Sequence, residues 1–359
     1  MAVSNLSQDI VIQPVRQNSD IGQVARKAQQ LAEELGFSKV AQEEIKITAN
    51  ELASNLVVHG AVEGNIFLYP VHRCGETGIA LVSTDQGPGI KSVSSAMADH
   101  RSTAGSMGCG LGAVKRLMDE FDIVSTPAEE AQHKTGYVGY KGGTIVASCK
   151  WCREDSGVPL QKNSLQWGAV CRPLPGYKEN GDAYYIKETE TQLFAVVIDA
   201  LGHGPEAEHA NQVALSFIKE NETMSFDDLF PNLHEVLRPT RGIAMTAISL
   251  DKAKRSFTHC AVGNVESRLF PNQTNTPVTR SGVVGHGIMP SLRVRTYLWP
   301  TNGMLIIHTD GVSSRWGHLP ETEIVKHHPL LMSHFLLHNY ERVRDDATVL
   351  VISETGCYD

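Results

Sequence analysis

Apolar positions along the first 150 residues follow two periods, and each period predicts a different kind of element. They recur every three or four residues over 21–35 and 40–58, which predicts two amphipathic helices, the first ending at Gly36. A third helical stripe follows a glycine-rich loop and covers 110–121. Alternating or continuous apolar runs predict strands at 9–16, 64–71, 78–84 and 143–150. Together these elements predict helices layered on one face of a mixed sheet.

The second half of the chain has shorter apolar runs separated by turn residues. Strands are predicted at 166–172, 182–187, 192–199, 243–250, 256–262, 266–270, 304–309 and 347–353, and helices at 204–220, 226–237 and 320–340. This pattern indicates a layered β-sandwich flanked by helices. The segment between the halves loses all periodicity, so we expect a first domain over 1–151, a linker over 152–165 and a second domain over 166–359.

Composition narrows the classes of function. A length of 359 residues favours two domains over one core. A net charge of -8 and a pI near 6.0 argue against a nucleic-acid partner, which needs a clustered basic face. No run approaches the ~20 apolar residues of a membrane helix, and the first residues lack the pattern of a signal peptide. The seven cysteines form no disulfide framework. We therefore expect a cytoplasmic protein.

One cysteine pair has the spacing of a metal or redox motif, Cys149-Lys-Trp-Cys152. A structural zinc site needs a second pair or histidines at ligand spacing, and the sequence offers neither. Two unrelated thiols at the end of a strand are the favoured interpretation.

Two polar residues of the second predicted helix carry candidate chemistry. Glu51 and Asn55 are four residues apart, so their side chains leave the same face. The carboxylate could accept the proton of an incoming hydroxyl, and the amide oxygen could hold a Mg2+ ion that bridges phosphates. Taken alone, the pair is better explained as part of a solvated helix face.

Three glycine-rich segments follow in an informative order. Asp85-Gln-Gly87-Pro-Gly89 comes after a strand, where a carboxylate can accept from an adenine amino group and bare backbone can approach the base. A loop containing Gly105, Gly108, Gly110, Leu111 and Gly112 leads into a helix, whose free amides favour phosphate. Gly143-Thr144 opens a further strand. Each segment alone is weak evidence; in this order they indicate an ATP site.

Residues 9–151 resemble the GHKL ATPase and kinase superfamily, and in particular the stressosome serine kinases that phosphorylate STAS-domain proteins. The segments 85–90 and 110–123 carry the likeness. The resemblance implies a Bergerat fold with Glu51 as general base, Asn55 as Mg2+ ligand, and Asp85 and Thr144 at adenine. It also implies a mobile lid over 105–112. A histidine kinase would need a phospho-accepting histidine on an upstream helical hairpin, but the first histidine is His59.

A second set of acidic residues lies at predicted strand ends: Asp182, Asp199, Asp310 and the pair Asp345-Asp346. Carboxylates at strand ends can aim several oxygen ligands at one point, which suits hard divalent cations. Two such cations can activate a water for in-line attack on phosphorus. For any one of these aspartates alone, an ordinary turn is the favoured interpretation. Their repeated position beside apolar runs favours metal.

Residues 166–354 resemble the PPM (type 2C) serine/threonine phosphatases of the SpoIIE-like branch, through the segments 167–182 and 261–269. The resemblance implies an αββα sandwich that binds Mn2+ or Mg2+. Asp199 would bridge two metals and the carbonyl of Ala200 would join it; Ala200 stands where the family often has glycine. Asp182 would hold one metal, and Asp310 with Asp345 or Asp346 the other, with Asp345 favoured. His203 and His308 are expected to be structural neighbours of the ligands.

The sequence therefore predicts an α+β protein that adds and removes phosphate. The first hypothesis is a partner-switching regulator that phosphorylates a serine or threonine of a STAS-domain protein with ATP and dephosphorylates a phospho-STAS protein. In the second, the N-terminal domain binds nucleotide and sequesters a downstream regulator, as anti-sigma factors do, without acting as a kinase. A third possibility is a phosphatase whose N-terminal domain senses ATP. No nucleic acid or membrane partner is expected.

Overall fold

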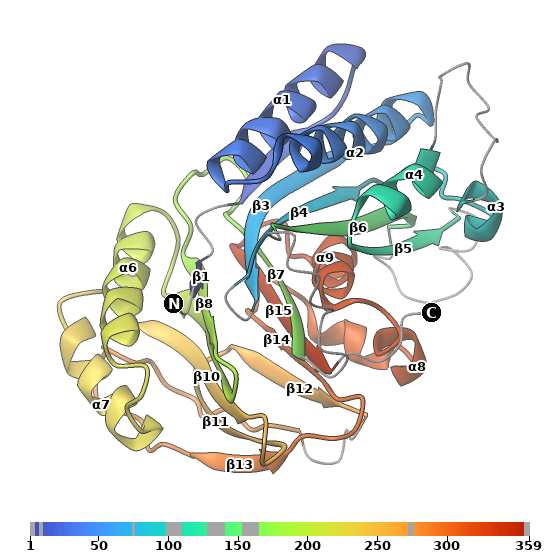
Figure 1. The fold of residues 1–359 in the computed structure, drawn as a ribbon. Helices are drawn as coiled ribbons and strands as arrows, with labels where there is room; N and C mark the ends of the chain where they lie inside the picture. The colour runs from blue at the N-terminus through green and yellow to red at the C-terminus, as the bar shows by residue number, and fades with distance from the viewer. Residues whose placement is uncertain are drawn as a thin grey trace. The chain divides into compact units, whose positions relative to one another are not determined.

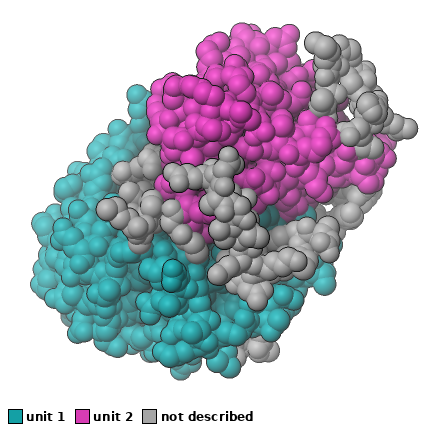
Figure 2. Space-filling model, viewed as in Figure 1, with its two compact units in different colours: residues 1–8, 160–359 teal, residues 9–159 magenta. Residues whose placement is uncertain are grey.

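The computed structural model describes residues 4–6, 10–73, 76–97, 110–127, 141–152, 165–271 and 276–354. The chain divides into two compact units (Figure 2), one formed by residues 9–159 and the other by residues 1–8 and 160–359. Each unit is described by itself below, as the nucleotide unit (9–159) and the acidic unit (1–8 and 160–359). Among the described helices, none is both long and apolar enough to cross a membrane.

The nucleotide unit is a five-stranded sheet with helices on one face (Figure 1). Its strands lie in the order β2-β3-β4-β6-β5, and every described neighbouring pair is antiparallel. Its elements are β2 (Val11–Pro14), α1 (Asn18–Glu34), α2 (Lys39–Val58), β3 (Asn65–Arg73), β4 (Glu76–Thr84), α3 (Val93–Met97), α4 (Gly110–Leu117), β5 (Glu120–Thr126) and β6 (Gly143–Cys152). The sheet is thus antiparallel, whereas the sequence pattern predicts a mixed one.

The apolar face of α2 fixes the helix on the sheet and leaves its polar face for chemistry. Ala49, Leu52 and Leu56 are buried in one core with apolar residues of β3, β4 and α4. Ser38 caps the helix, because its hydroxyl accepts the Ala41 N–H at 3.2 Å. Burying a leucine side chain contributes about 2 kcal/mol, so this stripe holds the helix in one rotation about its axis.

The helix predicted over 110–121 is shorter than expected, and a strand was missed. Helix α4 ends at Leu117, and β5 follows at Glu120. Asp119 makes the change of direction: its N–H donates to the carbonyl of Cys149 at 2.9 Å, and its carboxylate accepts the N–H of Trp151 at 2.7 Å. Both bonds attach the chain to β6, so the following residues pair with that strand instead of continuing the helix.

The acidic unit contains two sheets. The six-stranded sheet has the order β1-β8-β9-β10-β11-β13 and the four-stranded sheet the order β12-β14-β15-β7. The strands are β1 (Ser4–Leu6), β7 (Leu165–Arg172), β8 (Asp182–Glu188), β9 (Gln192–Ala200), β10 (Ile243–Asp251), β11 (Ser256–Val262), β12 (Glu266–Phe270), β13 (Arg295–Leu298), β14 (Met304–His308) and β15 (Ala347–Glu354). The helices are α6 (Pro205–Glu220), α7 (Phe226–Leu237), the 3-10 helix η3 (Ser314–His318), α8 (Glu321–Ile324) and α9 (Pro329–Tyr340).

Helices cover the outer faces of both sheets. Helices α6 and α7 lie along the sheet that contains β8, β9 and β10 (Figure 1), and their apolar residues share a core with alternate residues of these strands. Helix α9 packs on β7 and β15, and it comes so near that a Cβ at Gly168 would lie 2.3 Å from the backbone of Leu330. The layers are helix, sheet, sheet and helix. The predicted αββα sandwich is confirmed, and the chain is an α+β protein as expected.

Three details of this unit differ from the sequence prediction. The stretch 320–340 is two helices, because Pro329 begins α9 with its fixed φ and ends the preceding segment. Strand β13 was missed. Residues 4–6 form β1 and pair antiparallel with β8 of the acidic unit, whereas the sequence analysis placed them in the first domain. Backbone hydrogen bonds hold this short edge strand in place. With three residues, it is too short to show an apolar alternation in the sequence.

Candidate functional sites

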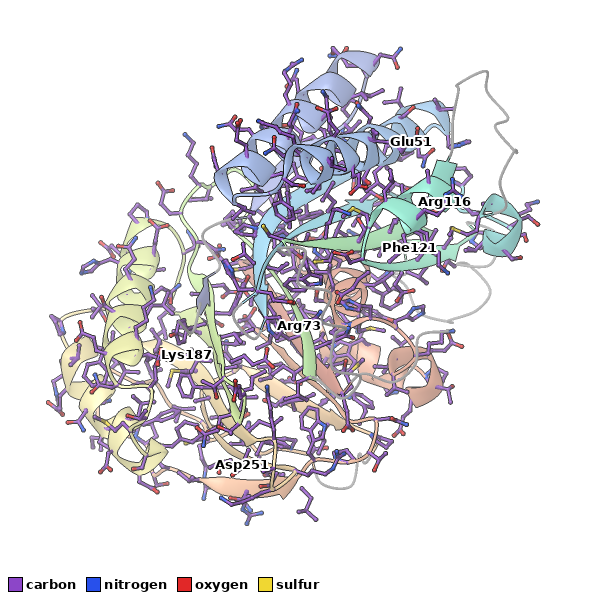
Figure 3. The ribbon with its side chains drawn as sticks, in the orientation of Figure 1. Glu51, Arg73, Arg116, Phe121, Lys187 and Asp251 are labelled. Atoms are coloured by element: carbon purple, nitrogen blue, oxygen red, sulfur yellow. The ribbon has the colours of Figure 1, made fainter. Side chains whose placement is uncertain are left out.

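The first candidate site lies where α2 meets the beginning of α4. Figure 3 shows Glu51 on α2, with Arg116 on α4 and Phe121 on β5. Partial burial raises the pKa of Glu51, and a hydrogen bond from the Gly110 backbone lowers it by a smaller amount. Glu51 therefore lies at the N-terminal end of α4. Asn55 is one turn further along α2 and half-buried.

Asp85 lies where β4 ends, beside the first residues of β6. Its N–H donates to the carbonyl of Thr144 at 3.0 Å, and its Oδ1 accepts the Gly87 N–H at 2.7 Å. Burial raises the pKa of this carboxyl, and the backbone hydrogen bonds from Gly87 and Thr144 lower it by less. The structure thus brings Asp85 and Thr144 together, as an adenine site requires.

Two glycines are needed here because neighbouring backbone leaves no room for a side chain. A Cβ at Gly143 would lie 1.9 Å from the carbonyl oxygen of Asp85, and a Cβ at Gly89 would lie 2.6 Å from that of Thr126. Both residues also have positive φ, +93° and +72°. The glycines predicted to expose bare backbone therefore also allow β4, β5 and β6 to end close together.

The remaining residues predicted for this site divide in two. Leu111 and Gly112 are buried in the first turn of α4, where Leu111 joins the core, while a Cβ at Gly110 would meet nothing within 4 Å. Gly105 and Gly108 lie outside the described residues, so the lid stays a prediction.

Sequence reasoning missed Ser125, which connects three parts of this site. Its hydroxyl accepts the Ile90 N–H at 2.7 Å and lies 2.8 Å from the hydroxyl of Thr144. Ser125 lies on β5. The sequence pattern predicts a helix over 110–121 and no strand after it. The run Phe121-Asp-Ile-Val-Ser-Thr126, rich in β-branched residues, was the available signal.

The Cys149-Lys-Trp-Cys152 pair does not form a site. The two residues are three apart on β6, so they lie on opposite faces of the sheet. Cys152 lies 3.5 Å from the carbonyl of Gly36, and neither cysteine forms a disulfide. Their placement on opposite faces agrees with the interpretation as two unrelated thiols.

The second candidate site is a group of aspartates at one end of the αββα sandwich. Asp182 begins β8 and lies directly opposite Asp199 of β9 in the antiparallel register. Burial raises the pKa of Asp182, with Asp199 as the next cause. Burial also raises the pKa of Asp199 to about 7, with Asp310 and then Asp345 among the further causes. The four carboxylates therefore share one region, with Asp310 after β14 and Asp345 before β15.

Ala200 is held next to this group. Its N–H donates to the carbonyl of Gly181 at 2.8 Å, which ties the end of β9 to the start of β8. The following turn contains Gly202, with φ of +84°, and His203, whose ring lies 5.1 Å from that of Tyr177 in an edge arrangement. His308 is buried, and its Nδ1 lies 2.9 Å from the carbonyl of Thr309.

The structure separates the roles of Asp345 and Asp346. Both carboxylate oxygens of Asp346 accept backbone N–H groups: Oδ1 from Leu174 at 2.7 Å and Oδ2 from Gly181 at 3.1 Å. Asp346 thus holds the loop between β7 and β8. Asp345 is half-buried and accepts the N–H of Asp346 at 3.0 Å. Burial and Asp310 raise its pKa.

The chemistry of these residues fits a divalent cation. The available ligands are carboxylate oxygens, which divalent cations such as Mg2+ prefer. The buried Oδ2 of Asp199 has no hydrogen-bond partner in the structure, and burying such an oxygen without a partner costs free energy. In the described part of the chain, however, no three acidic, histidine or cysteine side chains are close enough to hold a metal as they stand. Like charges repel without a counter-ion, so binding requires the carboxylates to draw together.

Asn264 and Thr309 belong to this site and were not predicted. The Asn264 amide donates to Asp310 Oδ2 at 2.7 Å, and the Thr309 hydroxyl donates to Asp182 Oδ2 at 2.6 Å. The only feature of the sequence that pointed to Thr309 is its position directly before Asp310. Asn264 lies in the turn between β11 and β12, where an asparagine is ordinary.

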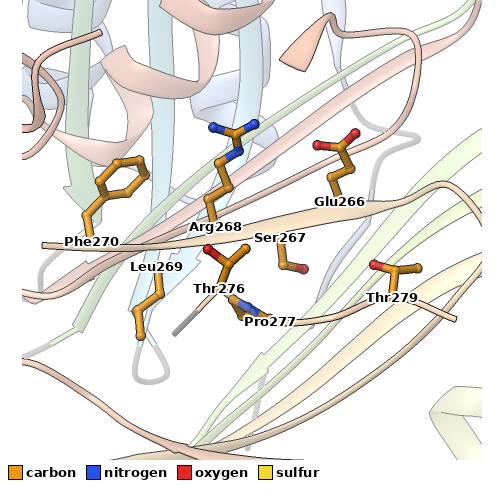
Figure 4. Close-up of a pocket in the computed structure, with 8 residues that line it drawn as sticks. All are labelled: Glu266, Ser267, Arg268, Leu269, Phe270, Thr276, Pro277 and Thr279. Carbon is orange, nitrogen blue, oxygen red and sulfur yellow. The ribbon is translucent and has the colours of Figure 1, made fainter. Parts of the chain in front are cut away.

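A hollow of about 340 Å3 lies beside β12 (Figure 4). It is lined by Glu266, Ser267, Arg268, Leu269, Phe270, Thr276, Pro277 and Thr279. The Arg268 guanidinium makes a cation–π contact with Trp316, 4.9 Å from the centre of the ring. The hollow contains none of the residues predicted for either site.

Comparison with known proteins finds a matching family model and two curated relatives. A model of the histidine kinase-like ATPase domain matches residues 15–132. The serine/threonine-protein kinase RsbT of Bacillus subtilis (strain 168) is 37% identical over 134 residues, which are 37% of this chain and 90% of that protein. The phosphoserine phosphatase RsbX of the same organism is 24% identical over 135 residues, which are 37% of this chain and 67% of that protein.

A solved structure of RsbX in complex with magnesium is also similar. It matches with a TM-score of 0.47 and 20% identity, over 55% of this chain and 98% of that chain.

Proposed function

Because the chain belongs to the histidine kinase-like ATPase family through its likeness to RsbT, and joins to it a domain similar to the phosphatase RsbX, we propose that it is a bifunctional partner-switching regulator. One unit transfers phosphate from ATP to a serine or threonine of a STAS-domain protein. The other removes phosphate from a phospho-STAS protein. The observation that carries this proposal is the presence of two separate acidic sites in one chain, each with residues suited to one of the two reactions.

In the kinase reaction, Glu51 accepts the proton of the substrate hydroxyl. The hydroxyl oxygen forms a bond to the γ-phosphorus while the bond from that phosphorus to the β–γ bridging oxygen breaks, and ADP leaves. The raised pKa of Glu51 supports this role, because a carboxyl with a higher pKa is a stronger base. Asp85 and Thr144 hold adenine at the other end of the site, and the Asn55 amide oxygen holds Mg2+.

In the phosphatase reaction, Asp182, Asp199, the Ala200 carbonyl, Asp310 and Asp345 hold divalent cations. When bound, these cations supply a water that is deprotonated near neutral pH and offset the charge of the phosphate. Asp199 contributes a buried oxygen that has no other partner in the structure. Asp346 keeps the β7–β8 loop, and so Asp182, in place through the backbone of Leu174 and Gly181.

Both reactions running freely on one serine would hydrolyse ATP without result. We therefore infer that the units act on different residues or that a partner switches them. Equal and partner-independent rates of addition and removal at one serine would contradict this inference.

Glu51→Gln provides a direct test of the kinase assignment, because it keeps the size of the side chain and removes the base. The purified full chain, ATP-Mg2+ and a STAS-domain protein encoded beside it are combined, and phosphate transfer and ATP binding are both measured. The proposal predicts loss of transfer by at least ~100-fold with ATP binding retained. A wild type that binds the STAS protein or a downstream regulator tightly but transfers nothing would instead support a sequestering module.

A further inference from the structure

The hydroxyl of Thr309 connects the two sheets of the acidic unit at the aspartate cluster. Thr309 follows the last residue of β14 and is fully buried. Its N–H donates to the carbonyl of Thr348 on β15 at 3.1 Å, so its backbone is fixed to the four-stranded sheet. Its side chain reaches the other sheet, where the hydroxyl lies 2.6 Å from Oδ2 of Asp182 on β8.

The direction of this hydrogen bond is determined by the second partner of the hydroxyl. The N–H of Thr348 lies 2.9 Å from Thr309 Oγ1, and a backbone N–H can only donate. The hydroxyl oxygen therefore accepts from Thr348, and its single hydrogen is left for the carboxylate of Asp182. This arrangement satisfies the hydroxyl on both sides and fixes the position of Asp182 Oδ2.

The rest of the surrounding network fixes the backbone of Asp182. The Asp182 N–H donates to Oδ1 of Asn180 at 3.0 Å, and the Asn180 amide lies 3.0 Å from Sγ of Cys171. The hydroxyl of Thr348 reaches the same sulfur at 2.9 Å. Burial raises the pKa of this thiol, so Cys171 stays a neutral structural group. Thr309 donates to the Asp182 carboxylate itself, and the Thr348 hydroxyl is a further side-chain partner of that carboxyl, whereas Asn180 holds its main chain.

We propose that Thr309 is a positioning residue for cation binding: its hydroxyl holds Asp182 Oδ2 and so leaves Oδ1 of the same carboxylate to the cation. The proposal rests on the proposed phosphatase function and names a residue beyond the ligands. An oriented carboxylate loses less conformational freedom when a cation binds, and outer partners of this kind typically change metal affinity by 10- to 100-fold.

The test compares Thr309→Val, which keeps the shape and removes the hydroxyl, with Thr309→Ser, which keeps the hydroxyl. Binding of Mn2+ to the full metal-free chain is measured by calorimetry, without any activity assay. We expect Thr309→Val to weaken Mn2+ binding by roughly 10- to 100-fold and Thr309→Ser to stay within about threefold of the wild type. Equal affinity in the wild type and Thr309→Val would overturn the proposal. Equal weakening in both variants would also overturn it, because packing would then be the cause.

A double-mutant cycle shows whether Thr309 acts through Asp182. In an Asp182→Asn background, Thr309→Val should change the remaining Mn2+ affinity by less than about twofold, whereas an unchanged effect would overturn the proposed route. Circular dichroism checks folding, and Thr309→Ala replaces Thr309→Val if the valine variant does not fold. A wild type that binds no Mn2+ would contradict the proposed phosphatase function itself. That outcome differs from equal Mn2+ affinity in the wild type and Thr309→Val, which would overturn only the role of Thr309.

Discussion

Asp182 and Asp199 are direct partners across two antiparallel strands, so two carboxylates leave the same face of the six-stranded sheet side by side. Asp182 is buried and Asp199 is half-buried, and the pKa of Asp199 rises to about 7. Like charges at opposite positions are unfavourable unless a cation lies between them. The two ionised carboxylates therefore repel each other at this end of the sandwich, and a divalent cation bound between them would offset that repulsion.

The pH dependence of stability follows from Asp199. In the metal-free protein its folded pKa, about 7, lies above its ordinary value of 3.8. Between these two values the folded state keeps a proton that the unfolded state has released, so stability falls as pH rises across this window and levels off above it. Asp199→Asn removes the titrating group. We expect the free energy of unfolding of this variant, relative to the wild type, to increase from about pH 5 to about pH 7.

Urea unfolding in EDTA at several pH values measures this difference for the transition of the acidic unit. A difference that is constant with pH would contradict the prediction. Added Mn2+ should stabilise the wild type more than Asp199→Asn, because a ligand that binds only the folded state stabilises it by mass action.

Asp345 and Asp346 should respond differently to the same substitution. Asp345→Asn removes a proposed ligand whose side chain is half-buried, so we expect Mn2+ binding to weaken by at least ~10-fold with little change in melting temperature. Asp346→Asn replaces an oxygen that accepts a backbone N–H with an amide that cannot, so we expect a loss of about 1–3 kcal/mol in metal-free stability. Calorimetric Mn2+ titration and thermal unfolding in EDTA separate the two. Equal effects in both assays would argue against this division of roles.

Gly143 should be intolerant of any side chain. In Gly143→Ala the new Cβ would lie 1.9 Å from the Asp85 carbonyl oxygen, at a φ of +93°. The backbone must therefore move, and Asp85 with it. Gly60→Ala is the matched control, because Gly60 also has positive φ, +63°, but has open space around it. We expect Gly60→Ala to cost about 1 kcal/mol in stability, and Gly143→Ala to cost more and to weaken ATP binding by at least ~10-fold. Similar ATP affinities in the two variants would refute the steric argument.

Ser125 should matter for nucleotide binding although it was not predicted. Ser125→Ala removes the acceptor of the Ile90 N–H and the neighbour of the Thr144 hydroxyl. Losing these hydrogen bonds should reduce the free energy of ATP binding by about 1 kcal/mol, which corresponds to roughly a fivefold weaker affinity. Ser125→Thr keeps the hydroxyl and should bind ATP nearly as the wild type does. Nucleotide titration of both variants tests this, and an unaffected Ser125→Ala would contradict the assigned role.

The sequence was most informative where one local rule determines the element. Helix α2 carries five buried apolar positions at helical spacing, and the strands beside the aspartates are continuous apolar runs, so both were predicted within a few residues. Strand β5 was missed because the stripe of α4 runs on into Phe121, and only the bonds from Asp119 to β6 end the helix. Strand β1 has three residues and no period to detect.

The candidate sites follow the same rule. Asp182, Asp199 and Asp310 could be predicted because each follows or begins an apolar strand. The different environments of Asp345 and Asp346 could not, because they depend on the backbone of Leu174 and Gly181, about 170 positions away. Thr309 reaches Asp182 across the two sheets, a contact 127 positions apart that no local pattern contains.

The most direct test of the central claim follows the mass of one STAS-domain protein through both reactions. The full chain is incubated with that protein and ATP-Mg2+, ATP is then removed, and Mn2+ is added. We expect a gain of one phosphate that Asn55→Ala fails to produce, followed by a loss that Asp310→Asn fails to produce. No gain with the wild type, despite a stable complex, would contradict the kinase half. A gain that the wild type and Asp310→Asn retain equally after Mn2+ addition would contradict the phosphatase half.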